Sequence, residues 1–219
     1  HSRLRTEVFA HPGPPPLPLY AWRARLAVDQ VPQSVDLRST VLWLAPGAHL
    51  VHYPLRGGRE LNVVAITGGA PADAPPAGRF GPPLQPLLDA IPGWTRWPLY
   101  GVAVPRPWVA GRIVMIGDAA HAMPPTAAQG GAQAIEDACT LAASLAERAE
   151  RPTEALAAWE AMRRPRVKRI AAESRRNLRL YHLAGLAALA RNAAIRALPP
   201  KMHLARLDWL FGWNPRQKP

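Results

Sequence analysis

The sequence predicts the α/β fold class, which in this chain takes an α+β form: a β-rich first half, one strand–loop–helix unit and a helical tail. Short apolar runs between glycine turns fill the first half. An apolar run rich in β-branched residues at 112–116 ends at Gly117-Asp118, and the chain from Thr153 onward shows only helical patterns. With 219 residues and 48% hydrophobic content, the chain can bury one good core or two small ones, which excludes a peptide module and a disordered protein.

The elements of the first half follow from alternation and from turn residues. Gly47 and the pair Gly57-Gly58 separate successive strands, which predicts an antiparallel meander. A helix is expected just before Pro92-Gly93, because proline and glycine end helices. The predicted strands cover 20–28, 41–44, 50–53, 61–67 and 97–104, and the predicted helix covers 84–91.

The run 112–116 predicts a buried strand that delivers Asp118 to the carboxyl end of a sheet, where α/β folds bind ligands. The loop 121–129 that follows is stiffened by Pro124-Pro125 and leads into a helix over 130–149. We expect this helix to pack through an apolar stripe and expect Cys139 to be a packing residue. The stripe comprises Ile135, Ala138, Cys139, Ala142, Leu145 and Ala149.

The segment contains candidate ligand-binding groups of three kinds. The Asp118 carboxylate can accept a hydrogen bond from a ligand hydroxyl, and the rigid prolines can lie against a flat ring. Gly130-Gly131 opens the helix without side chains that block its free N–H groups, so this end attracts negative charge. The alternative, a strand–helix corner in which Asp118 only caps the turn, would explain Gly-Asp alone but not the whole string.

The formal net charge is +12, and 12 basic residues oppose one acid, Glu173, between Arg163 and Arg206. We interpret this stretch as solvated helix faces; the alternative is a patch for nucleic acid or anionic lipid. The single cysteine excludes a disulfide scaffold and a multi-cysteine zinc site, and it fits a reducing compartment, so we expect a cytoplasmic protein without a metal. The apolar stretch 183–198 contains two arginines and is too short to span a membrane.

The string Gly117-Asp-Ala-Ala-His121, Pro124-Pro125, Gln129-Gly130 and Ile135-Glu-Asp-Ala138 resembles a known motif. It is similar to the second flavin-contact motif of the FAD-dependent aromatic hydroxylases, the single-component flavoprotein monooxygenases. The segments 20–23 and 42–58 look like the substrate-domain strands of the salicylate and 3-hydroxybenzoate hydroxylase branch.

The resemblance implies part of a Rossmann-like FAD-binding domain with an inserted antiparallel β-sheet substrate domain and a C-terminal helical region. His1 to Arg5 look like the residues directly after the family's Asp-Gly motif, so this motif and the Gly-x-Gly-x-x-Gly turn are expected upstream. We therefore expect the 219-residue chain alone to bind FAD poorly and to be inactive. The implied parts are a remnant of the FAD domain (1–18), the substrate domain (19–104), the C-terminal part of the FAD domain (105–180) and a helical tail (181–219).

The resemblance implies an FAD-dependent monooxygenase that hydroxylates a small aromatic acid or phenol with NADH or NADPH and O2, through a peroxyflavin. The alternatives are a monooxygenase of the same scaffold acting on a non-aromatic or epoxidisable substrate, and a non-enzymatic, arginine-rich remnant. Tyr53 and Arg23 are the candidate substrate residues, and no catalytic base is assigned. The implied flavin contacts are Gly117, Asp118, Pro124, Pro125, Gly130, Gly131 and Ala132.

Three histidines fall close to these candidates. The position of His121 within the motif suggests a structural, hydrogen-bonded role and not acid–base catalysis. His49, His52 and Tyr53 could line a substrate cavity, and since strand residues alternate, His52 and Tyr53 cannot both face it. We expect Tyr53 to be the one that does.

Overall fold

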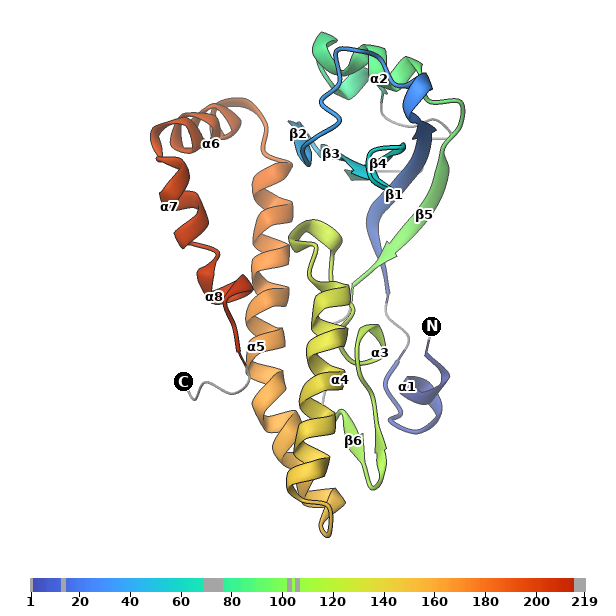
Figure 1. The fold of residues 1–219 in the computed structure, drawn as a ribbon, viewed down its shortest axis with the longest axis vertical. Coiled ribbons are helices and arrows are strands. Elements are labelled where there is room, and N and C mark those ends of the chain that lie inside the picture. Colours follow the sequence, from blue (N-terminus) through green and yellow to red (C-terminus); the bar gives the residue numbers. More distant parts are fainter. Residues whose placement is uncertain (1, 13–14, 69–76, 102–103, 105–106, 215–219) are drawn as a thin grey trace. The chain divides into compact units, whose positions relative to one another are not determined.

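The computed structural model describes residues 2–12, 15–68, 77–101, 104 and 107–214 (Figure 1). The chain divides into two compact units. The sheet unit comprises residues 16–99 and 179–192, and the helical unit comprises 1–15, 100–178 and 193–219.

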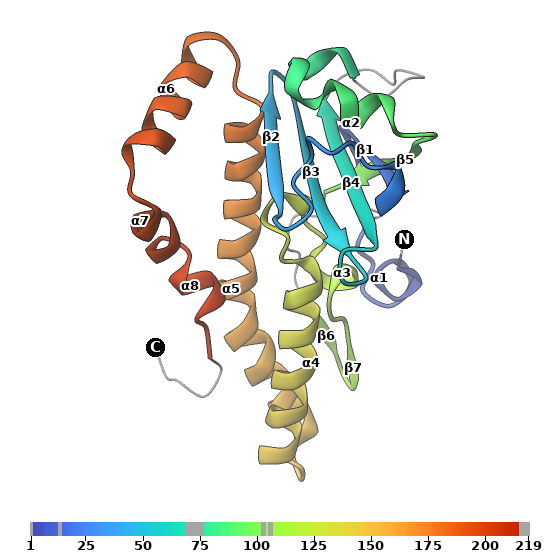
Figure 2. The same cartoon turned by 45° about the horizontal axis from the view of Figure 1, so that its top comes forward.

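The sheet unit contains a five-stranded sheet with the order β2-β3-β4-β1-β5. Figure 2 shows its strands β2, β3 and β4 side by side. The strands β2, β3, β4 and β1 pair antiparallel, which confirms the predicted meander. Residues 102–103, near the end of the strand predicted at 97–104, lie outside the described residues. The strands are β1 (Pro16–Ala27), β2 (Val41–Ala45), β3 (Ala48–Leu55), β4 (Glu60–Gly68) and β5 (Thr95–Tyr100).

One face of this sheet forms the core of the unit. Trp22, Leu50 and Ala65 lie in one cross-strand row of that face, and Val63 lies in the next row. Leu84 and other buried residues of a short helical segment pack against them. This segment comprises η2 (Ala77–Arg79), η3 (Pro82–Leu84) and α2 (Gln85–Asp89). The helix predicted at 84–91 is therefore present but begins as a 3-10 turn. A further 3-10 turn, η1 (Val28–Gln30), follows β1.

The helical unit is built on α4 (Gly130–Glu147) and the first part of α5 (Pro152–Tyr181), which lie side by side in both views (Figures 1 and 2). Its core contains Phe9, Trp108, Met115, Trp159 and Val167, and smaller elements complete the unit. These elements are α1 (Arg3–Glu7), β6 (Val109–Ala110), β7 (Ile113–Val114), α3 (Asp118–His121), η4 (Pro125–Ala127), α7 (Pro200–Ala205) and α8 (Asp208–Phe211), and α6 (Gly185–Ala197) crosses the boundary between the units.

The prediction of a buried strand at 112–116 is wrong for the described residues. Only Ile113–Val114 forms a strand, and it pairs with β6 in a two-stranded hairpin. Within the run only Met115 is buried, whereas Ile113 and Ile116 are 42% and 37% exposed. A strand is buried on both faces only where a wider sheet and its helices cover it, and a two-residue hairpin provides no such cover.

The apolar stripe predicted on the helix at 130–149 is also wrong about which face is buried. The buried face of α4 is polar and consists of Gln133, Asp137, Thr140 and Ser144. Ile135 is 67% exposed and Cys139 is exposed, so Cys139 is not a packing residue in the described structure. The periodicity was that of a helix, but hydrogen bonds and an ion pair with α5 decide which face is covered.

The helical tail differs from the prediction at one of its two breaks. Pro165 lies inside α5 and does not end it, because the side chains of Arg163, Val167 and Ile170 around it are buried and hold the helix in place. Pro199-Pro200 does separate α6 from α7. The charged stretch was interpreted as solvated helix faces, but Arg163 and Arg164 within it are buried. Arg175, Arg176 and Arg179 are exposed, as expected.

Among the described residues, no helix is both long and apolar enough to cross a membrane.

Candidate functional site: the Gly117 turn, the proline loop and the start of α4

The Gly117-Asp118 turn has a backbone conformation that requires glycine. Gly117 has φ 57° and ψ −143°, and a Cβ at this position would lie 3.1 Å from the Cβ of Ala134 on α4. The carbonyl of Gly117 accepts hydrogen bonds from the amides of Ala120 and His121, which start α3. The turn therefore lies directly against α4, with the exposed Asp118 as the first residue of α3.

The buried carboxylate of Asp137 joins this turn to α4. Its Oδ2 accepts hydrogen bonds from the amide of Gly117 at 3.0 Å and from Nε2 of His121 at 2.6 Å. Both side chains of the His121–Asp137 pair are fully buried. His121 therefore has the structural, hydrogen-bonded position expected from the sequence, and Nε2 is the donor because an ionised carboxylate only accepts.

Arg163 of α5 completes the partners of this carboxylate. Its Nε donates to Oδ1 of Asp137 at 2.9 Å, and its Nη2 donates to Oε1 of Gln133 at 2.8 Å. Burial by itself would raise the pKa of the Asp137 carboxyl, but hydrogen bonds from His121, Gly117 and Arg163 together hold that pKa below its usual value. The carboxylate is thus kept ionised by three donors that it holds together.

The proline loop is anchored on α5. The hydroxyl of Ser174 donates to the carbonyl oxygen of Pro124, and the hydroxyl of Thr126 donates to the carbonyl oxygen of Ser174 at 2.5 Å. Asn177 adds a hydrogen bond to the carbonyl oxygen of Thr126 at 3.4 Å. Pro124 is buried under these contacts, while Pro125 is exposed and available to a ligand.

The start of α4 has free N–H groups and no side-chain cap. Gln129 occupies the N-cap position without a capping hydrogen bond, and the first backbone bond of the helix runs from the amide of Gln133 to the carbonyl of Gln129. A Cβ on Gly131 would meet nothing within 4 Å, and one on Gly130 would meet Oδ1 of Asp118 at 3.8 Å. The amides of Gly130, Gly131 and Ala132 therefore remain available to an anionic or carbonyl ligand group.

All seven residues predicted to contact a cofactor belong to the helical unit, and the structure brings Asp118 next to the start of α4. A flavin fits these groups: an acceptor for a ribityl hydroxyl, free amides for a ring carbonyl and an exposed proline for a ring face. The residues that hold the set in place, Asp137, Arg163 and Ser174, were missed as site residues in the sequence. The available signal was weak: the IEDA string contains Asp137, but Arg163 looked like one member of a charged run.

Tyr53 and Arg23 belong to the sheet unit and lie on the sheet face opposite its core. Tyr53 is paired with Asn62, while Arg23 is paired with Val64, in the neighbouring row and two strands away from Tyr53. His52 lies on the core face and is 1% exposed, so the expected alternation is present, with Tyr53 facing away from the core. Arg23 is exposed and has no ion pair within the described part of the chain.

A pair of histidines, of which His49 is buried and His182 half-buried, occupies the same face as Tyr53. Nδ1 of His49 lies 2.9 Å from Nε2 of His182, and the ring of Tyr181 meets His49 edge-on. Burial, with the neighbouring His182 second, lowers the pKa of His49 to about 3, so His49 is neutral at physiological pH. This pair fixes the 179–192 segment to the sheet.

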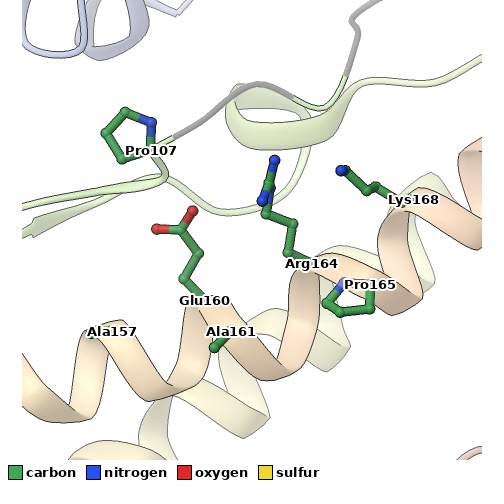
Figure 3. Close-up of a pocket in the computed structure, with 7 residues that line it drawn as sticks. All are labelled: Pro107, Ala157, Glu160, Ala161, Arg164, Pro165 and Lys168. Carbon is green, nitrogen blue, oxygen red and sulfur yellow. The ribbon is translucent and has the colours of Figure 1, made fainter.

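A separate cavity of about 620 Å³ lies in the helical unit between the Pro107 segment and α5 (Figure 3). Glu160, Arg164 and Lys168 project from one side of α5 toward it. The Glu160 carboxylate accepts a hydrogen bond from the amide of Trp108, whereas Nε of Arg164 is buried and unpaired among the described residues. None of the seven residues predicted to contact a cofactor lines this cavity.

Comparison with known proteins gives matches that include the Gly117 turn. Residues 86–174 match the model of a family described as "FAD binding domain". The chain is 32% identical over 205 residues to the 3-hydroxybenzoate 6-hydroxylase of Klebsiella oxytoca, a match that covers 88% of this chain and 52% of that enzyme. The chain is therefore similar in sequence to aromatic hydroxylases over most of its length.

Further comparisons also give aromatic hydroxylases as similar proteins. The salicylate hydroxylase of Pseudomonas putida is 33% identical over 195 residues, with 79% of this chain and 44% of that enzyme covered. The chain thus spans about half the length of the curated relatives it matches. In fold, it matches Klebsiella pneumoniae HpxO complexed with FAD and uric acid with a TM-score of 0.80 at 20% identity, over 94% of this chain and 56% of that one. A salicylate hydroxylase substrate complex matches with a TM-score of 0.75 at 22% identity, over 94% and 57%.

Proposed function

We propose that the protein is an FAD-dependent monooxygenase that hydroxylates a small aromatic acid or phenol with NADH or NADPH and O2, in the cytoplasm. The observation that carries this proposal is the uncapped start of α4 beside Asp118, held there by the Asp137 carboxylate. The named relatives that act on hydroxybenzoates and salicylate support the substrate class.

When bound, the flavin supplies the electron transfer and the oxygen chemistry. The chain's own residues bind and orient it. Asp118 would accept a hydrogen bond from a hydroxyl of the cofactor, and the amides of Gly130, Gly131 and Ala132 would donate to a carbonyl group of its ring system. The positive end of the 18-residue helix α4 would stabilise negative charge on that group by roughly 1 kcal/mol where water is excluded.

The substrate residues and the domain limits belong to the same proposal. Arg23 is exposed and unpaired among the described residues, as a side chain must be to pair with a substrate carboxylate. Tyr53 supplies a hydroxyl on the same sheet face. We assign residues 19–104 to substrate binding, residues 1–18 and 105–180 to the FAD-binding domain, and 181–219 to a helical tail.

The test uses the complete protein that the gene encodes, with any coding sequence upstream of His1 included. We expect stoichiometric FAD, NAD(P)H oxidation that a hydroxybenzoate or salicylate stimulates, and incorporation of one atom of ¹⁸O from ¹⁸O2 into the product. Asp118→Ala should weaken FAD binding, while the matched control Asp29→Ala in the sheet unit should not. A complete protein that binds no FAD, or that oxidises NAD(P)H identically with every aromatic acid tested, would refute the proposal.

A further inference from the structure

A second layer of ion pairs extends from the Gly117 turn to the end of the chain. The Glu136 carboxylate receives Nη1 of Arg163 at 2.6 Å on one side. On the other side Arg166 forms a two-pronged pair with it, with both distances 2.7 Å. Glu136 therefore bridges the arginine that binds Asp137 to a second arginine one turn further along α5.

Arg166 in turn binds the last described helix. Its Nη1 donates to the carbonyl oxygen of Trp209 at 3.1 Å, and its Nη2 donates to that of Leu210 at 2.9 Å. We call residues Asp208–Trp213 the tryptophan segment. Because one guanidinium serves both Glu136 and two backbone carbonyls, the position of the segment and that of Glu136 are fixed together.

The aromatic ring of Trp213 packs on the two arginines. The Trp213 ring lies 4.4 Å from the guanidinium carbon of Arg166 and 5.0 Å from that of Arg163, measured to the ring centroid. Such cation–π contacts strengthen as water is excluded, and Arg163 and Arg166 have side-chain exposures of 0% and 8%. The tryptophan segment thus shields the ion pairs on which the Gly117 turn depends.

We propose that the tryptophan segment positions the Gly117-Asp118 turn, through the ion pairs between α4 and α5. The path has five links: the segment's carbonyls, Arg166, Glu136, Arg163 and Asp137, which ends on the Gly117 amide. None of these five links is among the residues predicted to contact the cofactor, so the residues of the path are positioning residues. This proposal rests on the proposed function for one point, which is that the Gly117-Asp118 turn contacts the flavin.

The first test measures the turn without FAD. Hydrogen exchange is followed in peptides covering 113–122 of the complete protein, and peptides of β3 and β4 report whether the sheet unit stays folded. Arg166→Met should speed exchange of the Gly117 amide about tenfold, and so should a chain that stops after Leu207. Arg175→Met is the matched control, because Arg175 lies on the same helix, is exposed, and is not one of the two arginines that pair with Glu136.

The second test measures coupling. The chain that stops after Leu207 and Arg166→Met should each weaken FAD binding about tenfold, and the combination should weaken it hardly further, because both break the same path. Arg166→Lys, which keeps the charge but not the fork, should fall between wild type and Arg166→Met.

Unchanged exchange of the turn in both changed proteins, or independent tenfold losses that multiply in the combination, would overturn the inference. If the unchanged protein bound no FAD at all, the proposed function would fail, and the exchange measurement would still decide the positioning role.

Discussion

Asp137→Asn is the substitution that tests the site most directly. It keeps the size of a fully buried side chain but leaves one acceptor oxygen where two served three donors: Gly117, His121 and Arg163. Whichever way the amide turns, its NH2 group faces at least one of those donors. Each charge-assisted hydrogen bond lost costs about 1.5–3 kcal/mol.

The expected loss of stability for the helical unit is therefore about 3–4 kcal/mol, close to the cost of breaking a buried ion pair. Arg163 keeps its bond to Glu136, which limits the loss. The free energy of unfolding of a typical domain is about 5–15 kcal/mol, so we expect the variant to fold with marginal stability. Glu147→Gln provides the matched control, since Glu147 lies on the same helix, is 71% exposed and should change stability by less than about 0.5 kcal/mol.

The assay is hydrogen exchange resolved by peptide, because it gives separate free energies for the helical unit and the sheet unit. Peptides from α4 and α5 should lose protection in Asp137→Asn, while those from β3 and β4 should not. A loss below about 1 kcal/mol in the helical unit would show that the carboxylate does not hold the turn, the histidine and α5 together.

The same carboxylates make the stability of the helical unit depend on pH. Hydrogen bonds and ion pairs outweigh burial and lower the pKa of both Asp137 and Glu136. The unfolded chain then binds protons that the folded chain does not, at pH values below about 4. Stability is therefore fully present above that pH and is lost as the pH falls toward the folded-state pKa values. Asp137→Asn should flatten this loss.

Three further predictions concern single residues. Gly117→Ala should destabilise the turn by about 2 kcal/mol in thermal unfolding and weaken FAD binding, because its backbone conformation is strained for alanine; an unchanged melting temperature would contradict this. The sheet unit should lose up to about 2 kcal/mol of its free energy of unfolding as the pH falls from 6.5 to 5, because the pKa of about 3 keeps His49 neutral in the folded state while the unfolded chain takes up a proton. In urea titrations, His49→Gln should remove that part of the pH dependence. Cys139 should react with a thiol reagent in the native 219-residue chain at the rate of an exposed cysteine, and Cys139→Ser should abolish the signal, whereas reaction only after denaturation would restore the packing role.

The sequence by itself determined most of the elements and predicted the residues for cofactor contact. Alternation and glycine turns are local, so the strands of the meander and the helix that begins at Gly130 could be read from the residues. The string from Gly117 to Ala138 also predicted the flavin contacts that we propose, through its resemblance to a flavin-contact motif. His121 was correctly interpreted as structural on the same basis.

The tertiary structure decided which faces are buried and which charges are paired. The face of α4 with Asp137 is buried and the face with Ile135 is exposed, which reverses the hydrophobic expectation. The cause is long-range: Asp137 and Arg163 are 26 residues apart, and only the packing of α5 on α4 makes a buried carboxylate favourable. The run 112–116 is exposed for a related reason, since burial of a strand depends on neighbouring strands and helices that local pattern does not specify. Periodicity can be recognised within one segment of the sequence, whereas ion pairing and burial depend on which other segments of the chain pack against it.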